Sequence, residues 1–389
     1  MIPSRLLFAP LALNAATLRN RIVMAPMTRC RVSRDHAPLP MAARYYAQRA
    51  DAGLIVSEGI VVSDRGRGYA RTPALHSEHQ QQAWRRVTAA VHARGGRIFA
   101  QLWHCGRVSA AGVLPPGATP VGPGSKVAAC SVMAEDGRHR PCLTPCSVPR
   151  SLDTDEMPEL IQQFVLAARR ARDVGFDGVE IHAANGYLLD QFRCPYLNTR
   201  SDAYGGNVEG RCRLTLDVAA AVAHAIGSSH TGLRLSPLGT ANDMQPDPEP
   251  EATYGYLASR LDRLGLGYLH LADQSGDWIH QRRHPLLRCI RRNFHGTLVL
   301  CGGFDLASAE EALQAGSGDL IAFGRPFIAN PDLVSRLCHG TPLAPLDHDT
   351  LYTGGAHGYV DYSAHVTKPP ATRPRRMKRA TTAAAPAGS

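Results

Sequence analysis

The fold is decided by the segment Gly178-Val179-Glu180-Ile181-His182-Ala183-Ala184-Asn185-Gly186-Tyr187. Alternate side chains of a β-strand face opposite ways, so Val179 and Ile181 are predicted on one face and Glu180 and His182 on the other. An apolar face backed by a carboxyl and an imidazole is not typical of ordinary core. It indicates a barrel strand whose inward face ends at a reactive mouth. The simpler alternative is a satisfied core histidine followed by two loop residues.

The polar residues of this segment suit one kind of chemistry. His182 and Asn185 can both donate hydrogen bonds to a single oxygen atom. Tyr187 carries a phenol with an ordinary pKa of about 10, which is protonated at neutral pH and can act as a general acid. We therefore take His182, Asn185 and Tyr187 as the candidate catalytic residues.

Short apolar strands alternate with amphipathic helices along the chain. Strands are predicted over Arg21–Pro26, Gly53–Gly59, Arg97–Trp103, Gly178–Ala184, Gly232–Pro237, Tyr268–Asp273, Leu298–Gly303 and Leu320–Arg325. Predicted helices include Ser77–Arg94, Asp155–Asp173, Val208–Ile226, Pro250–Leu264, Ala307–Ala315 and Pro331–His339. Glycines that read as helix C-caps stand just before several strands, at Gly53, Gly95, Gly175 and Gly265.

Eight strands with helices between them predict an α/β fold, a (β/α)8 TIM barrel. A doubly wound sheet would be expected to have a Gly-x-Gly-x-x-Gly turn after its first strand, and Met24–Arg29 contains no glycine. The stretch His104–Leu152 is rich in Pro, Gly and Cys, and we expect it to form a long excursion over the barrel mouth after strand three. Residues 1–365 are predicted to form this single domain.

The charge of the chain is concentrated at its C-terminus. The formal net charge is +10, but residues 366–389 hold six Lys and Arg and no acidic residue, which leaves about four positive charges elsewhere. This tail is rich in Pro, Thr and Ala and is predicted to be a disordered basic extension. The modest charge of the body predicts no nucleic-acid partner. Association of the tail with nucleic acid or membrane is the alternative.

Cysteine usage and hydropathy predict a cytoplasmic protein. The ten cysteines follow no disulfide framework. Cys130, His139, Cys142 and Cys146 lie close in sequence, but their spacing fits no common zinc pattern, so no metal is predicted. The chain shows no hydrophobic leader and no apolar run of membrane-spanning length, and we expect a soluble, reduced protein.

Polar residues gather at the carboxyl ends of the predicted strands, where barrels place their active sites. Gln101 and Trp103 share one parity of strand three, Arg234 lies on strand five, and Thr28 follows strand one. An Arg, a Gln, a His and a Thr at one mouth would be costly to bury unless a polar ligand satisfied them.

The last two strands end in glycines, at Gly302 and Gly303 and again at Gly324, which precedes Arg325. This is the usual position of a phosphate site in such barrels, although these glycines could be plain turn formers. The expected ligand is phosphorylated and also needs a cation and an amide beside a flat polar ring of its own. These features predict flavin mononucleotide (FMN). Arg234 is then expected to stabilise the negative charge of the reduced flavin, and Gln101 and Thr28 to bind its pyrimidine edge.

At this point the chain resembles the Old Yellow Enzyme family of FMN-dependent ene-reductases, from Leu7 to about Tyr362. The matching runs are Asn20–Arg29 (NRIVMAPMTR), Tyr45–Ala50 (YYAQRA), Gln101–His104 (QLWH), Gly175–His182 (GFDGVEIH), Ala184–Phe192 (ANGYLLDQF) and Gly324-Arg325. Thr28 stands where some relatives have Cys. In this respect the chain is similar to the branch that includes the N-ethylmaleimide, nitrate-ester and oxophytodienoate reductases. The excursion at 104–152 matches poorly.

The resemblance implies a role for each matching position. It implies FMN contacts from Pro26, Met27, Thr28, Gly59, Gln101, Arg234, Gly302, Gly303, Gly324 and Arg325. It implies that His182 and Asn185 bind the substrate oxygen, and that Tyr69, Trp103 and Tyr352 line the substrate pocket.

The implied activity is reduction of activated C=C bonds in α,β-unsaturated carbonyl or nitro compounds. The hydride would come from NADPH or NADH through flavin N5, and the proton from Tyr187. Reduction of mainly nitrate esters, nitro compounds or quinones is the alternative, and a flavin-binding protein without turnover is another. We expect a small-molecule partner only, in a monomer or homodimer.

Overall fold

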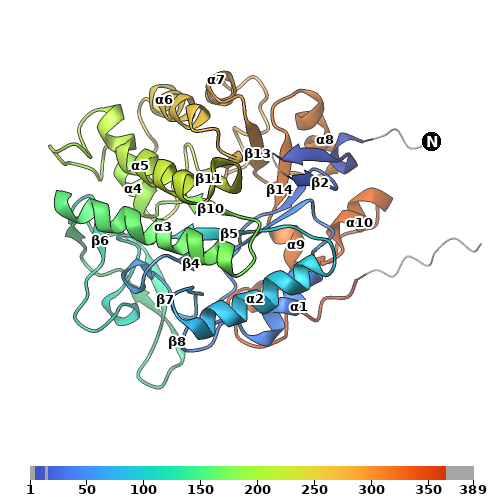
Figure 1. Ribbon diagram of the computed structural model, residues 1–389, viewed down its shortest axis with the longest axis horizontal. Coiled ribbons are helices and arrows are strands. Elements are labelled where there is room, and N and C mark those ends of the chain that lie inside the picture. Colours follow the sequence, from blue (N-terminus) through green and yellow to red (C-terminus); the bar gives the residue numbers. More distant parts are fainter. Residues whose placement is uncertain (1–4, 14–15, 365–389) are drawn as a thin grey trace, which may run out of the picture.

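The computed structural model describes residues 5–13 and 16–364. Within them, eight parallel strands close a barrel (Figure 1). In barrel order these are β3 (Ile22–Met24), β4 (Leu54–Val61), β5 (Ile98–Trp103), β10 (Gly178–His182), β11 (Thr231–Leu235), β12 (Tyr268–Ala272), β13 (Thr297–Cys301) and β14 (Leu320–Phe323). Pairing of β14 with β3 completes the ring. The TIM barrel predicted from the sequence is confirmed, and each strand overlaps its predicted segment.

Helices surround the barrel (Figure 1). They are α1 (Pro40–Ala47), α2 (Glu78–His92), α3 (Met157–Asp173), α4 (Leu188–Arg193), α5 (Val208–Ile226), α6 (Pro250–Arg263), α7 (Pro285–Asn293), α8 (Leu306–Gln314), α9 (Arg325–Ala329) and α10 (Leu333–His339). The six predicted helices correspond to α2, α3, α5, α6, α8 and α10. The other four are additional, and α4 and α9 are too short to show a clear apolar period.

The two faces of the barrel strands belong to different apolar clusters. Val179 and Ile181 pack outward into the core between strands and helices. Phe99, Tyr268 and Val299 belong to the smaller cluster inside the barrel. The alternation predicted for β10 is therefore present, and its inward residues face the barrel interior.

The amino-terminal end of the barrel is covered by a short hairpin of β1 (Leu11–Leu13) and β2 (Ala16–Leu18). Leu13 and Leu18 join the cluster inside the barrel. This leaves the opposite end, where the strands terminate, for a ligand.

Three of the four predicted cap glycines have left-handed backbone, namely Gly95, Gly175 and Gly265, with φ of 68°, 96° and 63°. The prediction was wrong for Gly53, which is not among the residues with positive φ. A Cβ at Gly53 would lie 2.1 Å from the Asn20 carbonyl oxygen. Close backbone approach, not helix capping, explains this glycine.

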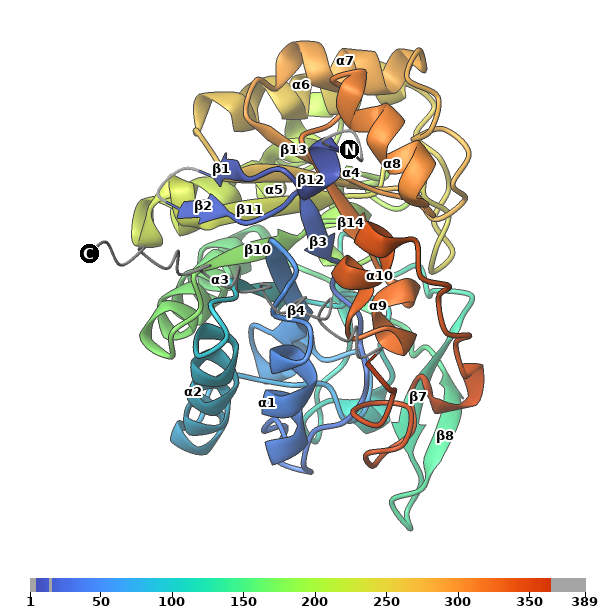
Figure 2. The same ribbon diagram turned by 90° about the vertical axis from the view of Figure 1, so that its right-hand side faces the viewer.

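The excursion after β5 forms small sheets of its own. β6 (Val121–Gly122) pairs with β9 (Arg150–Ser151), and β7 (Ser131–Glu135) forms an antiparallel hairpin with β8 (Pro141–Pro145). Figure 2 shows this hairpin projecting beside the segment that follows α10.

No helix within residues 5–13 and 16–364 is long and apolar enough to cross a membrane. The predicted disordered tail, residues 366–389, lies outside the described residues.

Candidate active site

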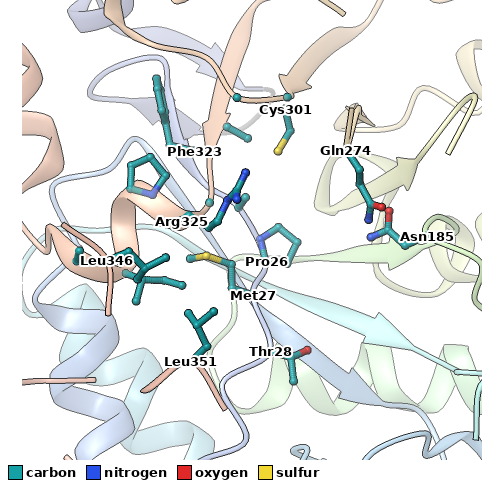
Figure 3. A pocket seen from close by; sticks show the side chains of 18 of the residues that line it. Pro26, Met27, Thr28, Asn185, Gln274, Cys301, Phe323, Arg325, Leu346 and Leu351 are labelled. Atoms are coloured by element: carbon teal, nitrogen blue, oxygen red, sulfur yellow. The ribbon is translucent and has the colours of Figure 1, made fainter. Parts of the chain in front are cut away.

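A cavity of 1050 Å³ opens at the carboxyl ends of the barrel strands (Figure 3). Twelve of the residues singled out in the sequence line it: Pro26, Met27, Thr28, Tyr69, Asn185, Tyr187, Arg234, Gly302, Gly303, Gly324, Arg325 and Tyr352. They come from segments far apart in the chain. The structure therefore gathers most of the predicted site around one space.

The turn after β10 aims Asn185 and Tyr187 at this cavity. Asn185 and Gly186 both have left-handed backbone, with φ of 58° and 76°. Asparagine tolerates this conformation better than most residues with a side chain. The Asn185 amide donates to Ser236 Oγ at 2.7 Å and the Gly186 amide to Asp190 Oδ2 at 2.8 Å. The tight turn is thus held by the side chain of the residue that follows β11 and by a side chain of α4.

The Tyr187 phenol is held among other aromatic side chains. Its hydroxyl lies 3.1 Å from the Tyr69 hydroxyl, and its ring meets Trp103 edge-on with ring centroids 4.9 Å apart. Burial raises the pKa of Tyr187 above its ordinary value. The phenol therefore keeps its proton at neutral pH until a strong base takes it.

His182 is a buried imidazole at the end of β10. Its Nδ1 accepts from the Ala184 amide at 3.3 Å, so in the neutral ring the proton sits on Nε2. Burial, with a further contribution from Arg234, lowers the pKa of His182 to about 3. The ring lies next to Tyr187, with centroids 5.0 Å apart.

Beneath the site, Glu180 organises a buried network. Its Oε1 accepts from Gln101 Nε2 at 2.8 Å, and its Oε2 accepts from the Tyr268 hydroxyl at 3.0 Å and lies 2.8 Å from His270 Nδ1. Burial opposes both charges, but the pairing outweighs it, lowering the pKa of Glu180 and raising the pKa of His270. Glu180 is thus scaffold for the site and does not line the cavity.

Arg234 supplies a buried positive charge at the cavity wall. It is 8% exposed, and its Nε has no hydrogen-bond partner within the described residues. Its Nη2 lies 3.9 Å from Cys301 Sγ. A buried guanidinium with an unused donor fits an electron-rich ligand in the cavity.

The phosphate end of the site has open backbone and a second cation. Gly303 has φ of 70°, and a Cβ there would meet nothing within 4 Å. Figure 3 shows the Arg325 side chain directed into the cavity near Cys301 and Phe323. Together with Arg234, these features fit an FMN molecule, which has a polar ring at one end and a phosphate at the other.

Four predicted residues are not among those that line the cavity: Gly59, Gln101, Trp103 and His182. Trp103 and His182 both contact the ring of Tyr187, which does line the cavity. A Cβ at Gly59 would lie 2.5 Å from the Trp103 ring, which accounts for a glycine there by packing alone. The FMN contact predicted for Gly59 stays a prediction.

Several lining residues were missed. Asp273 and Gln274 follow β12, and inspecting the end of that strand, as was done for its neighbours, would have found them. Ser131, Met133 and Leu143 come from the β7–β8 hairpin, and Leu343, Leu346 and Leu351 from the segment after α10. No periodicity in the sequence signals that these two segments meet over the mouth.

Within the described part of the chain, no group of three or more His, Cys, Asp and Glu residues could hold a metal ion. Cys142 lies opposite Ala134 in the hairpin, and His139 Nδ1 lies 3.5 Å from a Glu135 carboxylate oxygen.

Comparison with known proteins shows the family to which this chain belongs. The sequence profile of the NADH:flavin oxidoreductase / NADH oxidase family matches residues 6–344. Putative 12-oxophytodienoate reductase 2 of Oryza sativa subsp. japonica is 40% identical over 362 residues, covering 92% of this chain and 93% of that protein.

Two solved structures superimpose closely. Morphinone reductase in complex with tetrahydroNAD has a TM-score of 0.88 and 43% identity, covering 92% of this chain and 98% of that one. The old yellow enzyme homologue from Zymomonas mobilis has a TM-score of 0.87 and 42% identity, covering 92% and 99%. The chain therefore belongs to the NADH:flavin oxidoreductase / NADH oxidase family, and within it to the Old Yellow Enzyme group of FMN-dependent oxidoreductases.

Proposed function

We propose that this protein is an NAD(P)H-dependent ene-reductase that reduces activated C=C bonds of α,β-unsaturated carbonyl or nitro compounds. The observation that carries the proposal is the arrangement at the end of β10. His182, Asn185 and Tyr187 lie together beside a large cavity whose wall also holds the buried cation Arg234. Two donors and a phenol are the groups needed to polarise an oxygen and protonate a carbon.

FMN would occupy the part of the cavity lined by the ends of β3, β11, β13 and β14. Arg234 would bind its ring, and Gly302, Gly303, Gly324 and Arg325 its phosphate. Pro26, Met27 and Thr28 would contact it from the segment after β3, and Gln101 through its carbonyl oxygen, since its amide nitrogen is engaged by Glu180. When bound, FMN supplies hydride transfer from NADPH or NADH to the substrate.

His182 and Asn185 would bind the carbonyl or nitro oxygen of the substrate. The neutral His182 ring would donate through Nε2, and Asn185 through the nitrogen of its side-chain amide, Nδ2. These hydrogen bonds strengthen as negative charge develops on the oxygen, so they stabilise the transition state more than the ground state.

Tyr187 would give its proton to the α-carbon. The neighbouring Tyr69 hydroxyl can donate to the phenolate that remains, and the Trp103 ring helps to exclude water. The pKa of Tyr187, raised by burial, keeps the proton available across the neutral range.

The outer part of the cavity favours a substrate with an apolar body. Leu143 of the hairpin and Leu343 and Tyr352 of the C-terminal segment line it, and these side chains are 72%, 44% and 56% exposed. Apolar side chains left open at a cavity rim are typical of a ligand-binding surface. A cyclic enone is a suitable first substrate.

The decisive experiment follows the visible spectrum of the purified protein through both half-reactions. Anaerobic NADPH is expected to bleach a yellow protein, and 2-cyclohexenone is expected to restore the colour. The alternative outcome is a protein that stays bleached with enones and recolours with a nitro compound or a quinone. That result would identify the nitro compound or quinone, in place of the alkene, as the substrate. A protein that takes up no FMN would contradict the proposal.

We further propose that the protein acts in the cytoplasm as a monomer or homodimer without nucleic acid. All ten cysteines are free thiols in the structure, which supports a reducing compartment. Light scattering after gel filtration tests the oligomeric state. Neither the full chain nor a chain truncated after Tyr362 should bind DNA at low salt. DNA binding by the full chain that is lost on truncation would contradict this proposal.

A further inference from the structure

Two cysteines face each other at the open end of the β7–β8 hairpin. Ser131 pairs with Pro145 in the hairpin register, so the next pair outward is Cys130 opposite Cys146. The Cys146 amide donates to the Cys130 carbonyl at 3.1 Å. The two Sγ atoms lie 3.6 Å apart.

This backbone geometry suits a disulfide bond. The Cα atoms of directly opposite residues in an antiparallel ladder lie about 4.5 to 5.5 Å apart, and disulfides form at Cα separations of about 4.4 to 6.8 Å. Cys142 lies on β8 and faces Ala134. It has no cysteine opposite it and serves as an internal control.

The two thiols differ in access. Cys130 is half-buried, whereas Cys146 is 8% exposed. Burial, together with the neighbouring Cys130, raises the pKa of Cys146 to about 12. A dissolved oxidant therefore reaches Cys130 first, and Cys146 is placed to react with the product.

We propose that Cys130 and Cys146 form a redox-active dithiol that hydrogen peroxide converts reversibly to an intramolecular disulfide. Peroxide oxidises the Cys130 thiol to a sulfenic acid and leaves as one water molecule. The Cys146 sulfur then attacks the Cys130 sulfur, its proton goes to the departing hydroxyl, and a second water leaves. In sum, two thiols and one peroxide give one disulfide and two waters.

The modification lies next to the active-site loop. Cys130 Sγ lies within hydrogen-bond distance of Asn242 Oδ1, at 3.9 Å, and Asn242 Nδ2 donates to the Asn185 carbonyl at 2.8 Å. Ser131, which follows Cys130, lines the cavity. Disulfide formation removes the S–H donor to Asn242 and fixes the base of the hairpin. The proposal concerns the cysteines themselves and does not depend on the substrate proposed above.

The test is peptide mapping of the FMN-loaded, full-length protein after treatment with hydrogen peroxide. Remaining thiols are alkylated with iodoacetamide in denaturant, and the protein is cut with trypsin without reduction. Cleavage after Arg138 separates Cys130 from Cys142 and Cys146. We expect peptides 127–138 and 139–150 to be joined, and dithiothreitol to release them.

Two variants assign the bond. Cys142→Ser should give the same joined peptides, since Cys142 faces no cysteine. Cys146→Ser should leave Cys130 as a sulfenic acid that dimedone captures. The proposal is overturned if both cysteines stay separately alkylated under conditions that oxidise the exposed Cys338, or if Cys142→Ser abolishes the link. The first of these outcomes is measured on the wild-type protein, so the proposal can be overturned even if a variant fails to fold.

Discussion

The hydroxyl oxygens of Tyr69 and Tyr187 lie 3.1 Å apart, which joins the loop after β4 to the turn after β10. Burial raises the pKa of both phenols, so both are protonated at neutral pH. Only one of them can donate to the other, and donation by Tyr69 leaves the Tyr187 proton free to point into the cavity. In that arrangement the contact with Tyr69 orients the Tyr187 hydroxyl towards the cavity.

Replacing Tyr187 by Phe should separate the two half-reactions. Reduction of the bound flavin by NADPH needs no proton from the phenol and should be unchanged. Alkene reduction should slow by about 10²- to 10⁴-fold, the usual contribution of a general acid. Anaerobic stopped-flow measurement of each step checks this.

Tyr69→Phe is the matched control, because it removes the hydroxyl partner but keeps the Tyr187 proton. It should slow the same step by much less. If Tyr187→Phe slowed both half-reactions equally, Tyr187 would not be the proton donor.

Ligand binding should depend on His182 and Asn185 but hardly on pH. Because the pKa of His182 is lowered to about 3, the ring stays neutral between pH 8 and 5. Affinity for 4-methoxyphenol, followed by the change in the flavin absorbance band, should therefore be flat over this range. Replacing both residues by Ala, which removes both side-chain donors, should weaken binding by about 10- to 100-fold, from the loss of two hydrogen bonds.

Ser131→Ala, which alters a lining residue of the hairpin, should bind the phenol as the wild type does. A protonation step near pH 6.5 in the wild-type titration would show that His182 ionises and would argue against the neutral donor.

The barrel could be predicted from the sequence because its strands are short apolar runs bounded by turn residues. The inward parity of Glu180 was also predictable, since alternation along a strand is a purely local rule. Its partner His270 was not predicted, because the register between β10 and β12 passes through β11 and depends on closure of the whole barrel.

The outer wall of the site could not be predicted for a similar reason. Leu143 and Tyr352 are separated by more than half of the chain, yet they line one cavity. No local pattern encodes that contact. The apolar period also failed for α4 and α9, where the turn at Gly186 and the turn at Gly324 start the helices.

Acid should destabilise the folded protein in part through His104. Burial lowers the pKa of His104 from 6.5 to about 4. Between pH 6.5 and 4, the His104 imidazole therefore binds a proton in the unfolded chain but not in the folded protein. The folded protein loses stability as the pH falls through this range. Linkage puts this loss at about 3 kcal/mol for the one group.

Urea unfolding at pH 7 and pH 4.5 measures this contribution. The loss of stability on acidification should be smaller in His104→Gln than in the wild type. His139→Gln, which alters an exposed histidine, should leave the loss unchanged. An identical pH dependence in all three proteins would show that His104 is charged in the folded state or does not contribute.

Glu180→Gln should destabilise the barrel core and disturb the flavin site together. The carboxylate is fully buried and balances His270 directly and Arg234 through the shared interior. Without it, two buried cations have no compensating charge, which costs about 3 to 5 kcal/mol when one partner of a buried pair is removed. Urea unfolding should show this loss, while Glu159→Gln on the exposed face of α3 should show almost none.

Because His270 can lose its proton in response to Glu180→Gln, the loss of stability should be smaller at pH 8 than at pH 6. A loss that does not depend on pH would mean that His270 is neutral in the wild type.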